Sequence, residues 1–218
     1  MEDWRPIGRD EREVWQATAE QLELRFRPGT VNNPPHIHGE IDGFHVAVTC
    51  SFDRRDKGSS RTTYELSYSS LGAPIRIARQ STMARFGIVR RLIDLDDLEI
   101  GDSAFDNVAI IDAAEVDVAR AFLTSARRNA IAQLLAMSEL DGVVVSETTT
   151  TFETPRIEGS ARRLVGNLLG MAEFAKILSR SDPAGGPPPS DSALPSEPLR
   201  SLFDAPNQAS QQVQDEIR

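Results

Sequence analysis

The stretch HIHGEIDGFHV (residues 36–46) places an Asp-Gly pair between two short segments in which apolar and polar residues alternate. Asp-Gly is a favoured two-residue hairpin turn, because both positions of a type I′ turn need positive φ. The sequence therefore predicts a β-hairpin in which Ile41 pairs with Phe44 and the register continues outward to Ile37 with Val48. This register sends an apolar set to one face of the ribbon: Ile37, Ile41, Phe44, Val46, Val48 and Cys50.

The other face of the predicted hairpin gathers all three histidines of the chain beside a glutamate: His36, His38, Glu40 and His45. Imidazole and carboxylate are ligands for zinc or iron, and neighbouring positions on a strand pair lie roughly 5–8 Å apart. A metal site is therefore one interpretation of this face. The other is a polar ribbon surface that meets water, as one face of an antiparallel sheet commonly does.

The rest of the chain predicts an α+β fold with a mainly antiparallel sheet, because consecutive strand signals occur without a βαβ rhythm. We expect this sheet to pack against an N-terminal helix, a central helical pair and a long last helix. Asp10, with Glu13 three residues later, predicts the start of the first helix, and Ser160 that of the last. The expected elements are helices at 10–22, 115–122, 125–137 and from 160, and strands at 24–27, 62–68, 75–77, 105–111 and within 143–154.

Residues 183–199, PAGGPPPSDSALPSEPL, are too rich in Pro, Gly and Ser for a helix or strand to persist. We therefore expect one α+β domain over residues 1–182 and a disordered tail over 183–218. Within the tail, LRSLFDAP (199–206) is a short apolar island. Its Leu199, Leu202 and Phe203 have the spacing of one helical turn that docks in a partner's groove, and the alternative is an inert tail.

Charge is distributed unevenly along these 218 residues, whose net charge is -9. Residues 53–91 hold nine basic and three acidic side chains, a net of +6, whereas residues 92–119 hold nine acidic and no basic ones. The overall charge argues against non-specific nucleic-acid binding, and we expect no specific nucleic-acid partner. The basic stretch, with Arg54, Arg55, Lys57 and Arg61, indicates either a surface for an acidic protein or an anionic membrane, or side chains that are simply solvated.

Catalytic signatures are missing from the sequence: it contains no GxSxG motif and no phosphate-binding Walker loop. Cys50 is the single cysteine and falls on the apolar face of the hairpin, so we expect a buried small side chain instead of a nucleophile. No apolar run approaches the roughly 20 residues of a membrane span, and the charged N-terminal stretch is unlike a secretory signal. We expect a cytoplasmic protein with no cofactor, unless the hairpin binds zinc or iron.

Two parts of the chain, residues 37–50 and 98–155, resemble an uncharacterised bacterial domain-of-unknown-function family. In the hairpin the resemblance rests on an I-x-G-x-I-x-G-x-x-V pattern, here Ile37, Gly39, Ile41, Gly43 and Val46. In the second part it rests on Glu99, Phe105, Val108, Asp117, Ala119-Arg120, Leu123-Thr124 and Ser146. Members of that family are often membrane-anchored, and the resemblance implies a fold and no activity.

The sequence thus predicts a non-enzymatic cytoplasmic interaction or scaffold module that recruits a protein partner through its tail or a charged sheet surface. A metal-binding enzyme or sensor built on the histidine hairpin is the alternative. A peripheral membrane-associated module is a second alternative.

Overall fold

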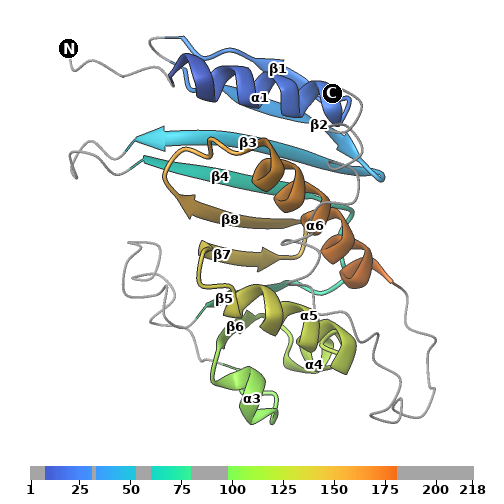
Figure 1. Ribbon diagram of the computed structural model, residues 1–218. Helices are drawn as coiled ribbons and strands as arrows, with labels where there is room; N and C mark the ends of the chain where they lie inside the picture. Colours follow the sequence, from blue (N-terminus) through green and yellow to red (C-terminus); the bar gives the residue numbers. More distant parts are fainter. Residues whose placement is uncertain (1–7, 31–32, 53–59, 80–97, 181–218) are drawn as a thin grey trace, which may run out of the picture.

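The structure, a computed structural model, describes residues 8–30, 33–52, 60–79 and 98–180. Its centre is an eight-stranded sheet in the order β1-β2-β3-β4-β8-β7-β5-β6, in which every neighbouring pair is antiparallel (Figure 1). The predicted α+β fold is therefore confirmed. The strands are β1 (Arg25–Arg27), β2 (His36–Ile41), β3 (Phe44–Phe52), β4 (Ser60–Ser67), β5 (Ile75–Arg79), β6 (Ala109–Ala113), β7 (Asp141–Ser146) and β8 (Thr149–Pro155).

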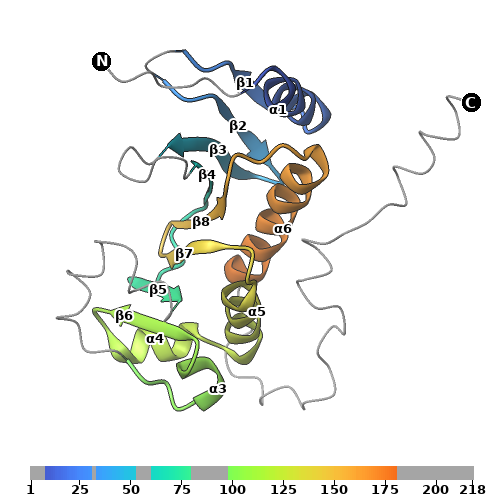
Figure 2. The ribbon, with the colours of Figure 1, turned by 60° about the vertical axis from the view of Figure 1, so that its left-hand side comes forward.

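Helices pack on one face of this sheet. Figure 2 shows α1 (Arg9–Gln21), α5 (Ser125–Ala136) and α6 (Ala161–Ser179) on the same side, with α1 over β1 and β2 and α6 over β3 and β4. Two shorter helices, α3 (Ser103–Asp106) and α4 (Val116–Phe122), lie toward the β6 end. None of the described helices is both long and apolar enough to cross a bilayer.

The hydrophobic core lies between the sheet and these helices. Trp15, Tyr64, Phe152 and Phe174 are completely buried there, and the rings of Tyr64 and Phe152 stack with centroids 4.8 Å apart. Burying a large apolar side chain stabilises a fold by roughly 1.5–3 kcal/mol. The indole of Trp15 also donates a 2.8 Å hydrogen bond to the carbonyl of Glu158, which joins α1 to the segment before α6.

The hairpin at residues 36–52 has the predicted geometry. Asp42 and Gly43 both have positive φ, 52° and 84°. The register runs from Ile41 with Phe44 to Ile37 with Val48, as the turn and the alternation predict, and ends at His36 with Thr49. The apolar face packs toward the helices, and Cys50 is buried on it.

The β-branched run after Gly142 was predicted as one strand and forms two, β7 and β8, which pair with each other. The Ser146 hydroxyl lies 2.8 Å from that of Thr149 and accepts a 3.1 Å hydrogen bond from its backbone N–H. Such side-chain hydrogen bonds stabilise a turn without Gly or Pro. The single-strand prediction was wrong because this turn has no glycine or proline signal.

Two other local predictions were wrong in a similar way. Phe105 belongs to α3 and not to a strand, since the Asp102 carboxylate accepts a hydrogen bond from the Phe105 N–H and starts a helical turn. Helix α1 begins after Gly8, so Asp10 lies in its first turn instead of capping it. There its charge still favours the helix N-terminus. Ser160, by contrast, caps α6 as predicted.

Gly39 allows the turn between α1 and β1 to lie directly on the sheet. A Cβ at this position would come 2.7 Å from the Leu24 Cδ2 atom and 3.4 Å from the Leu24 Cα. Leu24 is buried, and its N–H bonds the carbonyl of Ala19 at the end of α1. The absence of a side chain at Gly39 therefore sets how closely the α1–β1 unit approaches β2.

We expect Gly39→Val to lower the free energy of unfolding by about 1–3 kcal/mol, because the new side chain overpacks against Leu24. Chemical denaturation measures this. Glu40→Val, on the exposed side of the same strand, is the matched control and should stay within about 0.5 kcal/mol of the parent protein. In a Leu24→Ala background, Gly39→Val should lower the free energy of unfolding by less. Equal decreases in this free energy for Gly39→Val and Glu40→Val would contradict the proposed overpacking against Leu24.

Candidate functional site

The sheet face opposite the helices is polar and accessible. In β2, β4 and β8, buried residues alternate with partly or fully exposed ones, as expected for a sheet with one covered face. Helices α1, α5 and α6 lie on the other face (Figure 2). The accessible face is built from threonine, serine and charged side chains, among them Thr49, Thr63, Glu65, Thr151 and Glu153.

Four nitrogen-bearing side chains gather at one corner of this face, which we call the basic corner: Arg25, Arg27, His36 and His38. Arg25 lies directly opposite His38, and Arg27 directly opposite His36, in the β1–β2 register. Residues directly opposite each other in an antiparallel pair send their side chains to the same face. The rings of His36 and His38 stack with centroids 4.7 Å apart and planes 15° apart.

The basic corner disfavours further positive charge. Burial lowers the pKa of His36 below 6.5, and the charges of His38 and Arg27 lower it further, against a smaller raising effect of Glu65. Burial also lowers the pKa of His38, with additional contributions from Arg27 and then Arg25. Near neutral pH both imidazoles are therefore mainly uncharged beside two guanidinium groups, and they gain charge only in more acidic solution.

The residues predicted as metal ligands are distributed over two parts of the hairpin. His36 and His38 lie in the basic corner, whereas Glu40 pairs with His45 next to the turn. Within the described ranges, no group of three or more His, Cys, Asp or Glu side chains is arranged to hold a metal ion. The zinc or iron site stays a prediction, and elemental analysis of the purified protein beside His38→Ala tests it.

The predicted anionic-partner surface is only partly described. Arg61 is held in a salt bridge with Glu153 at 3.0 Å and lies 4.0 Å from Asp141, on the same accessible face. Its charge is therefore partly neutralised within the sheet. Arg54, Arg55 and Lys57 lie outside the described residues, as do Leu199, Leu202 and Phe203 of the predicted tail contact.

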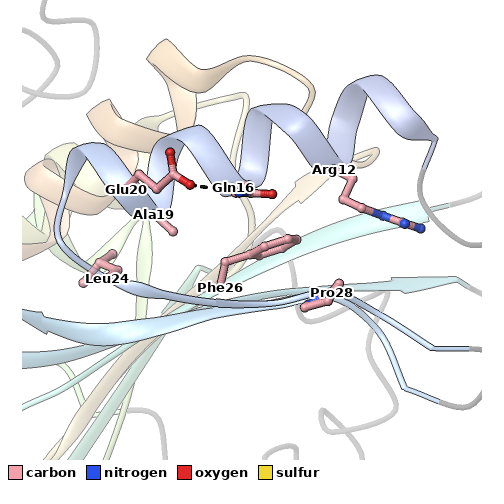
Figure 3. A pocket seen from close by; sticks show the side chains of 7 residues that line it. All are labelled: Arg12, Gln16, Ala19, Glu20, Leu24, Phe26 and Pro28. Carbon is pink, nitrogen blue, oxygen red and sulfur yellow. Dashed lines mark hydrogen bonds between the residues drawn. The ribbon is translucent and has the colours of Figure 1, made fainter.

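A hollow of about 540 Å³ lies between α1 and β1, on the helix side of the strand that carries the two arginines of the basic corner (Figure 3). Helix α1 contributes Arg12, Gln16, Ala19 and Glu20, and the chain from Leu24 to Pro28 forms the other wall. The Phe26 ring points toward α1, and Gln16 donates a 2.9 Å hydrogen bond to Glu20 across one helical turn. This hollow was not predicted from the sequence. The signal that could have indicated it is the RFR pattern of residues 25–27, in which alternation places the aromatic side chain on the face opposite the two arginines.

Comparisons with known proteins give no match: no family model, no curated protein and no solved structure is similar to this chain. The resemblance to a domain-of-unknown-function family therefore stays a prediction. Any functional inference rests on the geometry of the sheet face and its edges.

We expect Arg27→Gln to raise the pKa of both His36 and His38, and Arg25→Gln to raise that of His38 alone, because Arg27 acts on both imidazoles. Titration of the imidazole C–H resonances by NMR measures both values, with Arg162→Gln on α6 as the control. If the pKa values of His36 and His38 are unchanged in Arg27→Gln, the charge of Arg27 does not lower them.

The same lowered pKa values have a consequence for stability. An unfolded chain takes up protons on these histidines near pH 6.5, before the folded protein does. The contribution of the histidines to the free energy of unfolding is therefore retained above that pH and is lost as the pH falls through 6.5 toward the lower folded-state values. The double variant His36→Gln/His38→Gln should show a weaker decrease in stability over this interval.

Proposed function

We propose that this protein is a non-enzymatic cytoplasmic interaction module that binds an acidic segment of a partner protein at the basic corner. The observation that carries the proposal is the pairing of Arg25 with His38 and Arg27 with His36 on the accessible sheet face. Both arginines are exposed, and neither forms a salt bridge with another described residue. Two adjacent guanidinium groups suit carboxylates, which they bind through paired, charge-assisted hydrogen bonds.

A protein partner fits this corner better than a nucleic acid or a membrane. The whole chain carries a net charge of -9, which repels extended anionic surfaces at long range. Screening confines the field of a small basic cluster to about 8–10 Å in physiological salt. The basic corner therefore acts on a short acidic segment that reaches it.

The environments of the described nucleophiles also support a binding role. Burial raises the pKa of the Cys50 thiol to about 11, so it stays protonated and unreactive at neutral pH. Burial likewise raises the pKa of Tyr68 to about 12 and that of Tyr64 still further. A reducing compartment suits a chain whose single cysteine is buried. The predicted apolar island at 199–206 is a separate candidate contact for the same or another partner.

A fluorescently labelled oligoglutamate peptide tests the proposal by anisotropy. We expect Arg27→Glu to weaken binding at least tenfold, a loss of about 1.4 kcal/mol. Arg162→Glu changes the charge equally at an exposed position of α6, and we expect it to stay within roughly twofold of the parent protein. Binding should strengthen as the pH falls from about 7.5 to about 5.5, because His36 and His38 gain charge. Equal losses in the two variants would refute binding at the basic corner.

A further inference from the structure

Strand β1 ends the sheet, since it pairs with β2 on one side and stands first in the strand order. No described strand pairs with its outer edge, so no strand of the described part of the chain uses the backbone groups on that side. Exposed edges of this kind are recognised by extended peptides, with main-chain hydrogen bonds providing affinity and pockets for alternate side chains providing specificity. The edge of β1 is only three residues long, Arg25–Arg27.

Alternation along β1 gives its two sides opposite chemistry. Arg25 and Arg27 pair with His38 and His36 and lie on the accessible face, in the basic corner. Phe26 pairs with the buried Ile37, so its ring lies on the helix side, where it lines the hollow beneath α1 (Figure 3). A strand added beside β1 would therefore place alternate side chains near the two arginines on one side and near Phe26, one of the four apolar residues in the lining of the hollow, on the other.

The hollow lies beside the short connection between α1 and β1, which local contacts hold in place. Glu23 has a positive φ of 55°, and the Leu24 N–H bonds the carbonyl of Ala19 at 2.8 Å. Leu24 in turn rests on Gly39 of β2, where a Cβ would collide with it. The hollow of about 540 Å³ falls within the range of roughly 300–1,000 Å³ usual for ligand pockets.

We infer that the outer edge of β1 accepts an extended segment of the partner as an additional strand, in which acidic residues alternate with apolar ones. The acidic side chains meet Arg25 and Arg27, and the apolar side chains enter the hollow beside Phe26. This inference rests on the proposed function and specifies the partner that the function requires. The partner is a segment in which acidic and apolar residues alternate and which binds through its backbone.

A second copy of the chain is a poorer occupant of this edge. Antiparallel pairing of two β1 strands would set the arginines of one copy against those of the other on the same face. Like charges directly opposite each other destabilise a strand pair. Short, positively charged edge strands are a general protection against self-association. In β1 the same charges that discourage a second copy favour an acidic strand.

The test uses the full chain and a labelled peptide of alternating glutamate and valine. Two backbone-methylated forms of the peptide are compared, one N-methylated at the glutamates and the other at the valines. In a strand only one alternate set of amides faces the neighbouring strand. We therefore expect one methylated form to bind at least tenfold more weakly than the parent peptide, a loss of about 1.4 kcal/mol. The other methylated form should keep nearly the affinity of the parent peptide.

Loss in both methylated forms, or in neither, overturns strand addition. If strand addition is overturned but the peptide still binds and Arg27→Glu weakens that binding, the proposed function stands without strand addition. If no acidic peptide binds, both proposals fail.

Selectivity provides a second measurement that depends on the hollow. The preference for the glutamate–valine peptide over a glutamate–serine peptide should fall in Phe26→Ser, because the apolar wall is removed. Phe44→Ser is the matched control, since Phe44 is also partly buried on the helix side but lies away from the hollow. Unchanged preference in Phe26→Ser, with intact folding verified by circular dichroism, contradicts the proposed role of the hollow.

Discussion

The pairing of β4 with β8 is the contact on which the rest of the structure depends. It joins residues 62–67 to residues 149–154, so that two sets of strands distant in sequence form one sheet. The Tyr64 and Phe152 rings are partners in this register and stack at the centre of the core. The hydroxyl of Thr62 bonds the carbonyl of Arg156 and accepts from the N–H of Glu158, which guides the chain toward α6. Without this pairing, α6 would have no continuous sheet to cover.

The described helices cover one side of the sheet, and this coverage determines where function can lie. Apolar side chains of β2, β3 and β4 are buried against α1 and α6, and the alternate side chains remain accessible. The sheet ends at β1, beside which α1 leaves a hollow. The basic corner and the hollow are consequently two sides of one edge, and the proposed partner strand contacts both.

Neighbouring residues change the kind of ligand that the histidines favour. Viewed along the sequence, HIHGEIDGFHV is a set of potential metal ligands. In the sheet, His36 and His38 lie opposite Arg27 and Arg25. Burial lowers the pKa of both imidazoles, and the neighbouring guanidinium groups lower it further. A field of this sign attracts carboxylates and opposes cations, which is why we base the proposed function on anion binding.

The sequence by itself determined the α+β class, the hairpin register, the sorting of its two faces and the cap at Ser160. These features depend on local physics: turn conformation, alternation of side chains and a hydroxyl at a helix start. It did not reveal the turn between Ser146 and Thr149, which relies on side-chain hydrogen bonds instead of Gly or Pro. Only the tertiary structure decided that β1 aligns its arginines with the histidines and that a hollow lies between α1 and Phe26. Both depend on packing between segments, Leu24 on Gly39 above all, and no local sequence pattern specifies such contacts.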